Sequence, residues 1–187
     1  KHSSKLILLD ATGEYRDLVG DVTHFHFGDP FHEADFSFRA SIPPCCFLEQ
    51  DFISLFEPSG KVQGPKLRAA IRSLKLAEIE PRAADKDGIV VKIGVKHKTI
   101  ARIENQFSEQ LENPKQTFNP DNLVKQLVQE CVKYSGEKEG VEDDWNFNFC
   151  LPMITRIAGI LRSDALAPVF QHAENPIDKV IDDFLRG

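Results

Sequence analysis

The sequence predicts an α+β protein that is mainly helical, with a short N-terminal sheet fragment followed by a helical body. The first 42 residues hold short apolar or alternating segments separated by Gly and Pro, which is typical of strands. From Phe47 onward, apolar residues recur at helical spacing. Asn119-Pro120 and Asn175-Pro176 each pair a capping side chain with a proline suited to a first helical turn. We therefore expect a strand region over residues 1–42 and a predominantly helical region over residues 43–187.

The N-terminal region is expected to contain three strands. Residues 6–9 form a continuous apolar run, as in a strand that is buried on both faces of a parallel sheet. Residues 21–27 alternate, which places His24 and His26 on one face and the phenylalanines on the other. Residues 35–39 also alternate polar and apolar side chains and are the third predicted strand.

The second region is expected to contain six helices. Apolar residues at helical spacing occupy residues 47–56, 66–77, 99–111, 119–134, 152–162 and the segment after Asn175-Pro176. Residues 89–95 are rich in β-branched side chains and predict a strand, whereas residues 135–144 predict a solvated acidic loop. Pro65 is expected in the first turn of the second helix. The expected core stripe of that helix is Leu67, Ala70, Ile71 and Leu74.

Composition predicts a globular protein without a membrane partner. The 187 residues are 41% hydrophobic and 28% charged, with a mean hydropathy of −0.30. No apolar run approaches the roughly 20 residues of a membrane span, and no signal peptide is visible, so we expect a cytoplasmic location. Cys45, Cys46, Cys131 and Cys150 lack any C-x-x-C spacing, which favours free thiols over a zinc site.

The most informative local motif is KLILLDATGEY, residues 5–15. The apolar run followed by Asp10 is similar to a Walker B strand, but Ala11 stands where an ATPase usually carries the catalytic Glu. Read as local structure alone, Asp10 begins a turn with Thr12 and Gly13 in which its side chain bonds backbone amides two residues on, and Glu14 is a surface acid. Gly13 permits the tight turn.

The whole string resembles the second sheet strand of HerA-like ATPases, relatives of the FtsK translocases, where Asp-Pro-x-Gly-Glu-Tyr is usual and Ala11 here replaces the Pro. Three later segments, FLEQDFISLF, GPKLRAAIRSLKL and MITRIAGILRSDAL, are similar to those between the first strands and the Walker B strand of that family. The resemblance implies an insertion-type helical domain of a P-loop ATPase. It also implies that Asp10, Gly13 and Glu14 lie near the nucleotide.

For the intact parent protein, the resemblance implies ATP and Mg²⁺ as cofactors, DNA as a partner and a homo-oligomer, expected to be a hexamer. It leaves open a nuclease partner and whether the role is in repair or defence. The first residue is Lys1 and Met153 is the only methionine, which indicates a fragment of a longer protein.

The parts of an ATPase that bind phosphate have no counterpart in these 187 residues. The nearest sequence, residues 58–62, has no Gly five positions before Gly60, and Val62 cannot ligate a metal. No Walker B acids or arginine finger match either. We therefore expect no catalytic residue in this chain, no cofactor bound by the chain alone and no ATP hydrolysis by the chain alone.

Charge is unevenly distributed along the chain. The net charge is −6, yet residues 61–102 hold eleven Lys and Arg against four acids and so carry +7. Within this block Arg68, Arg72 and Lys75 recur at i, i+4 and i+7, so they share one helix face. Such a stripe can grip DNA phosphates without reading sequence. The alternative interpretation is an ordinary solvated helix face.

The resemblance implies an ATP-dependent DNA translocase or helicase. Two further functions stay open beside it. The first is a non-enzymatic helical adaptor in which the GEY turn is a coincidence. The second is a metal-dependent hydrolase, because His24, His26, His32 and Glu33 include a His-x-His pair on one strand face. Zinc would need further ligands, so the predicted metal set is none.

Overall fold

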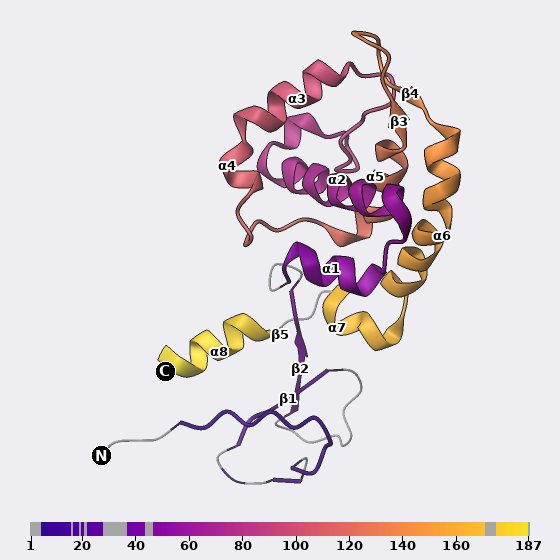
Figure 1. The fold of residues 1–187 in the computed structure, drawn as a ribbon. Coiled ribbons are helices and arrows are strands. Elements are labelled where there is room, and N and C mark those ends of the chain that lie inside the picture. The colour runs from indigo at the N-terminus through magenta and orange to yellow at the C-terminus, as the bar shows by residue number, and fades with distance from the viewer. Residues whose placement is uncertain are drawn as a thin grey trace. The chain divides into compact units, whose positions relative to one another are not determined.

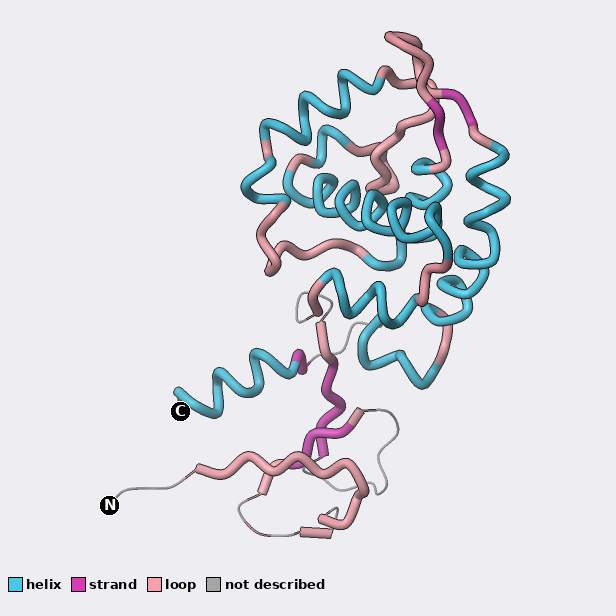
Figure 2. The backbone as a smooth tube through the Cα atoms, in the orientation of Figure 1, coloured by secondary structure: helices cyan, strands magenta, loops and turns pink. Residues whose placement is uncertain are grey.

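The computed structural model describes residues 5–15, 17–18, 20, 22–27, 37–43, 47–170 and 175–186 (Figure 1). The chain forms two compact units. Unit 1 comprises Lys1–Pro43 and Asp164–Gly187, and unit 2 comprises Pro44–Ser163. In the part of the chain that the structure describes, helices make up 57% and strands 10%, which confirms the predicted mainly helical α+β class. Helix dominates unit 2 in particular (Figure 2).

Unit 2 is built around one long helix, α2 (Gly60–Ile79), which contacts several others (Figure 1). Its predicted core stripe is confirmed, because Leu67, Ala70, Ile71 and Leu74 are all buried. The helices packed around α2 are α1 (Glu49–Phe56), α4 (Ser108–Leu111), α5 (Leu123–Glu130) and α6 (Asp144–Leu161). The remaining elements are η2 (Pro81–Ala83), α3 (His97–Gln106), η3 (Pro120–Asn122) and the antiparallel pair β3 (Val132–Lys133) and β4 (Val141–Glu142).

Two predicted helix starts are wrong, in both cases because a proline lies inside the helix rather than in its first turn. Helix α2 begins at Gly60, five or six residues early, and Pro65 lies inside it. The early start is supported by Gln63, whose Oε1 accepts a hydrogen bond from the Ser59 amide at 2.7 Å. Helix α6 begins at Asp144, where the Asp143 side chain accepts from the Asn146 amide. Pro152 therefore also lies within a helix.

The strand predicted at residues 89–95 does not form, apart from an isolated bridge between Ile93 and Gly140. Its backbone pairs with side chains of α5 instead: the Val90 amide donates to Gln126 Oε1 at 2.9 Å, and the Lys92 amide donates to Gln129 Oε1 at 3.0 Å. Gln126 Nε2 in turn donates to the Val90 carbonyl. These two glutamines satisfy the polar groups that a neighbouring strand would otherwise pair. The segment predicted as an acidic loop carries β4 and joins it to β3, and α5 ends at Glu130 rather than near residue 134.

Unit 1 contains a small, entirely parallel sheet in the order β1 (His24–His26), β2 (Ser37–Ser41), β5 (Asn175–Pro176). Residues 22–27 alternate between half-buried and exposed side chains, as predicted. The C-terminal part adds η4 (Asp164–Leu166), α7 (Ala167–Phe170) and α8 (Ile177–Arg186), and the Ile42 amide donates to the Pro168 carbonyl at 2.8 Å. Residues 164–187 join unit 1 because β5 pairs with β2, whereas the sequence grouped them with the helical region.

The predicted strand at residues 6–9 is not present. Leu6 and Leu9 are 83% and 91% exposed, and no described strand pairs with this segment. A strand exists only where a neighbour completes its backbone hydrogen bonds, so apolar character alone did not produce one. The apolar face predicted for the helix after Asn175-Pro176, which is α8, is exposed as well, at Ile181, Phe184 and Leu185. Across the described residues, no helix is both long and apolar enough for a transmembrane span.

Candidate functional site

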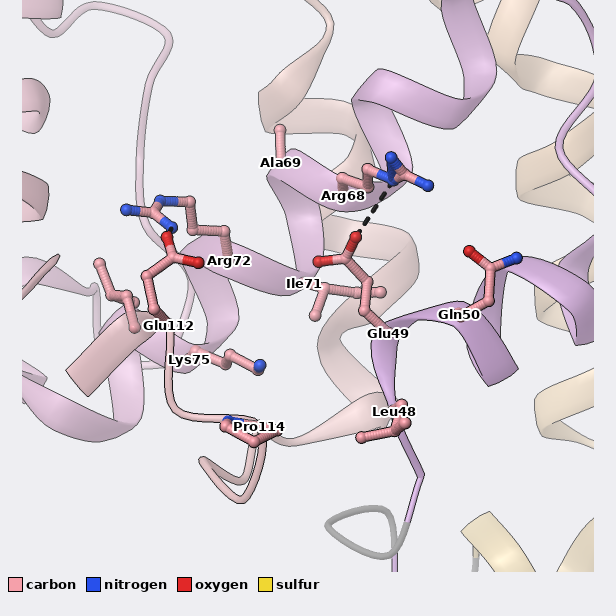
Figure 3. A pocket seen from close by; sticks show the side chains of 11 residues that line it. Leu48, Glu49, Gln50, Arg68, Ala69, Ile71, Arg72, Lys75, Glu112 and Pro114 are labelled. Atoms are coloured by element: carbon pink, nitrogen blue, oxygen red, sulfur yellow. Dashed lines mark hydrogen bonds and ion pairs between the residues drawn. The ribbon is translucent and has the colours of Figure 1, made fainter. Parts of the chain in front are cut away.

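A groove of about 560 Å³ opens between α1, α2 and the segment that follows α4 (Figure 3). The three residues predicted to contact DNA, Arg68, Arg72 and Lys75, all line it. They meet there because a spacing of four and three residues keeps side chains on one side of α2. The other lining residues are Leu48, Glu49, Gln50, Ala69, Ile71, Leu111, Glu112 and Pro114.

Each arginine of the groove is paired with a carboxylate from another element. Arg68 Nε lies 3.1 Å from Glu49 Oε1 in the first turn of α1. Arg72 Nη1 donates to Glu112 Oε1 at 2.5 Å, and Arg72 Nε lies 3.8 Å from Glu104 Oε2 of α3. The pairs with Glu49 and Glu112 are solvent-exposed, so each contributes at most about 1 kcal/mol.

Lys75 differs from the two arginines. Among the described residues, it has no hydrogen-bond or ion-pair partner. Its amine end points into the open space bounded by Glu49, Leu48 and Pro114 (Figure 3). The groove thus presents, beside two guanidinium groups, one ammonium that has no partner among the described residues, which is an arrangement that can hold anions.

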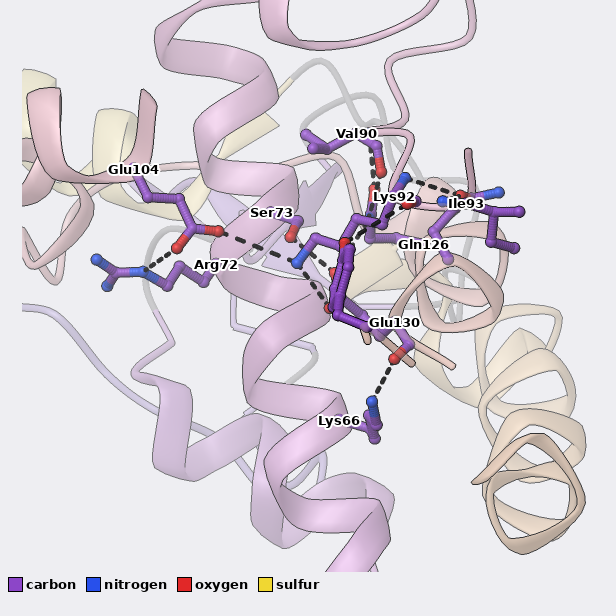
Figure 4. Close-up of polar contacts among 11 residues, drawn as sticks. Lys66, Arg72, Ser73, Val90, Lys92, Ile93, Glu104, Gln126 and Glu130 are labelled. Atoms are coloured by element: carbon purple, nitrogen blue, oxygen red, sulfur yellow. Dashed lines mark hydrogen bonds and ion pairs between the residues drawn. The ribbon is translucent and has the colours of Figure 1, made fainter. Parts of the chain in front are cut away.

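A polar cluster joins α2, α3, α5 and the segment after residue 89, and it includes the groove residue Arg72 (Figure 4). Lys92 Nζ lies 2.7 Å from Glu130 Oε2 and 4.0 Å from Glu104 Oε1. Glu130 Oε1 accepts from Ser73 Oγ at 2.7 Å and from Gln126 Nε2 at 3.1 Å. Glu104 is therefore shared between the buried Lys92 and the groove residue Arg72.

Lys66 adds a further contact to this cluster, because its ammonium donates to the backbone carbonyl of Glu130. Sequence reasoning missed Lys92 and Glu130. A signal was present in Glu130, which follows Leu123 and Leu127 at the spacing of the buried face of α5. A carboxylate on an apolar face implies a buried partner, but the sequence did not show which residue supplies it.

The turn after residue 9 forms as the local interpretation predicted. Asp10 Oδ1 accepts from the amides of Thr12, Gly13 and Glu14 at 3.2, 2.8 and 3.2 Å, and Oδ2 accepts from the Tyr15 amide at 2.9 Å. Gly13 has a φ of +77°. The hydrogen bond from the Tyr15 amide is the largest cause of the lowered pKa of Asp10; desolvation opposes it, and the bonds from Gly13, Thr12 and Glu14 add to the lowering. Asp10 therefore organises the turn with both of its oxygens.

The remaining predicted sites belong to unit 1. Glu14 is exposed, and nothing in the structure tests the prediction that Asp10, Gly13 and Glu14 lie near a nucleotide. In the described part of the chain, no group of three or more His, Cys, Asp or Glu residues is placed to hold a metal ion. The His24 ring contacts the Leu18 carbonyl at 2.8 Å through Nε2. His32 and Glu33 lie outside the described residues.

Residues 58–62, the nearest sequence to a phosphate loop, run from the connection after α1 into the first residues of α2. Ser59 is the N-cap of α2, and Gly60 has a φ of +68°. Comparisons of the chain with protein-family models, with curated proteins and with solved structures gave no match. No relative therefore assigns a role to the groove, the polar cluster or the Asp10 turn.

Proposed function

We propose that this chain is part of an ATP-dependent DNA translocase or helicase of the HerA-like class, in which unit 1 contributes strands to the ATPase core and unit 2 is a helical insertion. One observation carries the proposal: β2 and β5 are parallel neighbours in the sheet of unit 1, yet all of unit 2 lies between them in the sequence. Parallel neighbours require a crossover connection, and a helical unit can serve as a long one.

The surface of unit 1 supports the same proposal. Parallel sheets occur almost only in α/β proteins, where helices cover both faces. Here Phe25, Phe27 and Phe38 are exposed, and the rings of Phe25 and Phe38 lie against each other at 5.7 Å. Residues 6–9 expose a further apolar run. An ATPase core with additional strands and helices would bury these side chains, and residues 6–9 would then pair as a strand.

The Asp10 turn has a role within this proposal. Because Asp10 is occupied by four backbone amides, it serves to hold the turn, and Glu14 is the carboxylate left to face a nucleotide. In the intact protein, ATP and Mg²⁺ would be bound by a phosphate loop outside these residues, while the groove of unit 2 would contact DNA. A cytoplasmic location, assembly into a hexamer and a nuclease partner belong to the same proposal.

The test is ATP hydrolysis by the intact protein, with and without duplex DNA. We expect DNA-stimulated hydrolysis, no hydrolysis by the 187-residue chain alone, and a fall in kcat of at least about tenfold in Glu14→Gln of the intact protein. Glu137→Gln, in the exposed loop between β3 and β4, is the matched control and should leave kcat unchanged. An intact protein that fails to hydrolyse ATP in the presence of DNA would contradict the proposal.

A second candidate, a non-enzymatic helical interaction domain, is favoured by the outer face of α6. Trp145 and Phe149 are 61% and 50% exposed, and their ring centroids lie 4.3 Å apart. Exposed aromatic pairs often mark protein interaction surfaces. This function requires no ATP hydrolysis by the intact protein and a loss of biological activity in the double variant Trp145→Ser and Phe149→Ser. An active ATPase that is unaffected by that variant would argue for the translocase.

A further inference from the structure

The groove of unit 2 is lined by basic side chains on one side and by acidic side chains on the other. Helix α2 supplies Arg68, Arg72 and Lys75 (Figure 3). Glu49 belongs to α1, and Glu112 is the residue that follows α4. The two acids do not pair with each other's arginine: Glu49 takes Arg68 and Glu112 takes Arg72. Among the described residues, the two carboxylates that line the groove are therefore both placed against its guanidinium groups.

These carboxylates are weakly held. The side chains of Glu49 and Glu112 are 44% and 73% exposed, so solvent screens both ion pairs and little free energy opposes their release. Arg68 contacts its carboxylate through one nitrogen, and Arg72 contacts its two carboxylates through two. A guanidinium group has five N–H donors, so both arginines keep donors for a second anion.

Arg72 would keep its place if Glu112 moved away. Its Nε lies 3.8 Å from Glu104, whose side chain is only 25% exposed and which also lies 4.0 Å from the buried Lys92. Glu104 thus positions Arg72 from the side of the protein interior, and Glu112 contacts it from the solvent side. Release of Glu112 would leave a positioned arginine rather than a freely moving one.

The spacing of the three cations suits a nucleic-acid backbone. Seven helical residues rise by about 10 Å. One strand of duplex DNA carries a charge about every 3.4 Å along its axis, so about three phosphates fall within that span. The groove has no strand edge that could pair with a peptide, because its described lining comes from helices and from the residues after α4. Phosphodiesters are therefore favoured over an acidic peptide.

We infer that Glu49 and Glu112 are intramolecular competitors that occupy Arg68 and Arg72 until the phosphodiester backbone of a nucleic acid displaces them. This inference rests on the proposed function for the choice of DNA as the ligand, and it adds the regulation of the groove. Binding by the native chain is then weak and independent of sequence. The competitors set the affinity, and Lys75 makes the first contact because it has no partner to lose among the described residues.

The test is the affinity of the full 187-residue chain for a fluorescent duplex of mixed sequence, measured by anisotropy at several salt concentrations without nucleotide. The native chain should bind with a dissociation constant in the range of roughly 10⁻⁴ to 10⁻⁶ M that is typical of non-specific binding. The double variant Glu49→Gln and Glu112→Gln should bind about tenfold more tightly. Its log–log salt slope should steepen by about two, because two further phosphates are neutralised.

Matched controls separate this effect from a change in net charge. The double variant Glu137→Gln and Glu139→Gln removes the same two charges from the loop between β3 and β4, which does not line the groove. It should bind like the native chain. Added to the double variant Glu49→Gln and Glu112→Gln, which we call the unmasked variant, Lys75→Gln should weaken binding and reduce the salt slope by about one. Lys61→Gln, which lies outside the groove, should change the affinity of the unmasked variant little.

Three outcomes would overturn the inference. The first is equal affinity of the two double variants, since it would reduce the effect to net charge. The second is no weakening by Lys75→Gln in the unmasked variant. The third is tight binding of a poly-glutamate peptide in place of the duplex, which would make the groove a peptide site. The binding assay contains no nucleotide, so its results do not depend on whether the intact protein hydrolyses ATP. Failure of this inference can therefore be distinguished from failure of the proposed function.

Discussion

Lys92 Nζ lies 2.7 Å from Glu130 Oε2, and both residues are buried, at 8% and 4% exposure. Glu130 is the more fully satisfied of the two, because Ser73 and Gln126 also donate to its carboxylate. The pair connects the segment of residues 89–95, whose only strand-like pairing among the described residues is an isolated bridge from Ile93 to Gly140, to α5 and α2. It therefore stabilises an arrangement that a regular backbone ladder would otherwise provide.

The first prediction concerns this buried pair. Glu130→Gln leaves the Lys92 ammonium buried without its main counter-charge, and such changes cost about 3–5 kcal/mol. We expect the lower end of that range, because Glu104 remains 4.0 Å from Lys92. The measurement is the free energy of unfolding in urea. Glu137→Gln, an exposed acid, should stay within about 0.5 kcal/mol of the native protein.

A double-mutant cycle sharpens this first prediction. Lys92→Met should also destabilise the protein, because it leaves Glu130 without its cation. Combined with Glu130→Gln, it should cost clearly less than the sum of the two single changes, since neither variant group then carries an unpaired charge. Strict additivity would show that the two side chains do not interact.

The second prediction tests the core of unit 2. Leu127 of α5 is fully buried, and α5 packs on α2, so Leu127→Ala should reduce the free energy of unfolding by about 2–5 kcal/mol. Leu151→Ala in α6 makes the same chemical change on a side chain that is 44% exposed. This control variant should cost much less. Equal losses measured by urea titration would be inconsistent with this core.

The third prediction concerns the pH dependence of the Asp10 turn. The amide hydrogen bonds lower the pKa of Asp10 below its ordinary value. A depressed pKa means that the carboxylate supports the turn at neutral pH, and that this support is lost as the pH falls through the lowered pKa. NMR titration of the Asp10 carboxyl carbon should therefore show a midpoint below the ordinary value of 3.8.

The fourth prediction uses Gly13 to test the cause of that shift. The φ of +77° is strained for Ala, although an added methyl group would meet no atom within 4 Å, so Gly13→Ala should loosen the turn through its backbone alone. The pKa of Asp10 should then rise toward its ordinary value. Gly64→Ala, at a position with similar space and no positive φ, is the control and should leave the Asp10 midpoint unchanged.

The fifth prediction concerns the buried thiols of Cys131 and Cys150. Burial, and next the nearby Cys150, raise the pKa of Cys131 to about 12, and burial raises the pKa of Cys150. Both thiols should resist iodoacetamide at about pH 8 in the native protein and react in urea, as mapped by mass spectrometry. Rapid native labelling of either thiol would contradict this burial.

The same shifts predict a loss of stability at high pH. Above about pH 9 the unfolded chain releases the thiol protons while the folded protein retains them, so the unfolded state binds fewer protons and the free energy of unfolding falls as the pH rises toward 12. Below about pH 9 the thiols should contribute no pH dependence. The double variant Cys131→Ala and Cys150→Ala should remove this part of the dependence.

The sequence located most helices of unit 2 but not their ends. Apolar spacing identified the buried stripe of α2 correctly, because a repeat near 3.6 residues reflects which face is buried. The helix starts predicted from Pro65 and Pro152 were wrong, because both prolines lie inside their helices. A proline indicates the first turn only when no upstream residue caps the helix. Ser59 is the N-cap of α2, and its amide donates to Gln63, whereas Asp143 is the N-cap of α6. Such capping depends on side-chain geometry that apolar periodicity does not reveal.

Part of the candidate site was equally visible in the sequence. The spacing of Arg68, Arg72 and Lys75 placed them on one face, and the structure brings them to one groove. The pairing of the two arginines with Glu49, Glu104 and Glu112 was not predictable, because these acids come from three other parts of the chain. The Asp10 turn itself was predictable, since its hydrogen bonds connect residues within five positions of each other, although the bonds from the Glu14 and Tyr15 amides extend it beyond the prediction.

By itself, then, the sequence determined what depends on neighbouring residues: the helical class, the stripe of α2, the basic face and the turn at Asp10. Tertiary structure alone decided the rest. Because β5 pairs with β2, residues 164–187 belong to unit 1. Contacts to Gln126 and Gln129 replace the strand predicted at residues 89–95. Residues 6–9 have no partner strand among the described residues. The physical reason is that strands and buried charges need partners from distant parts of the chain, whereas helices and turns satisfy most of their hydrogen bonds locally.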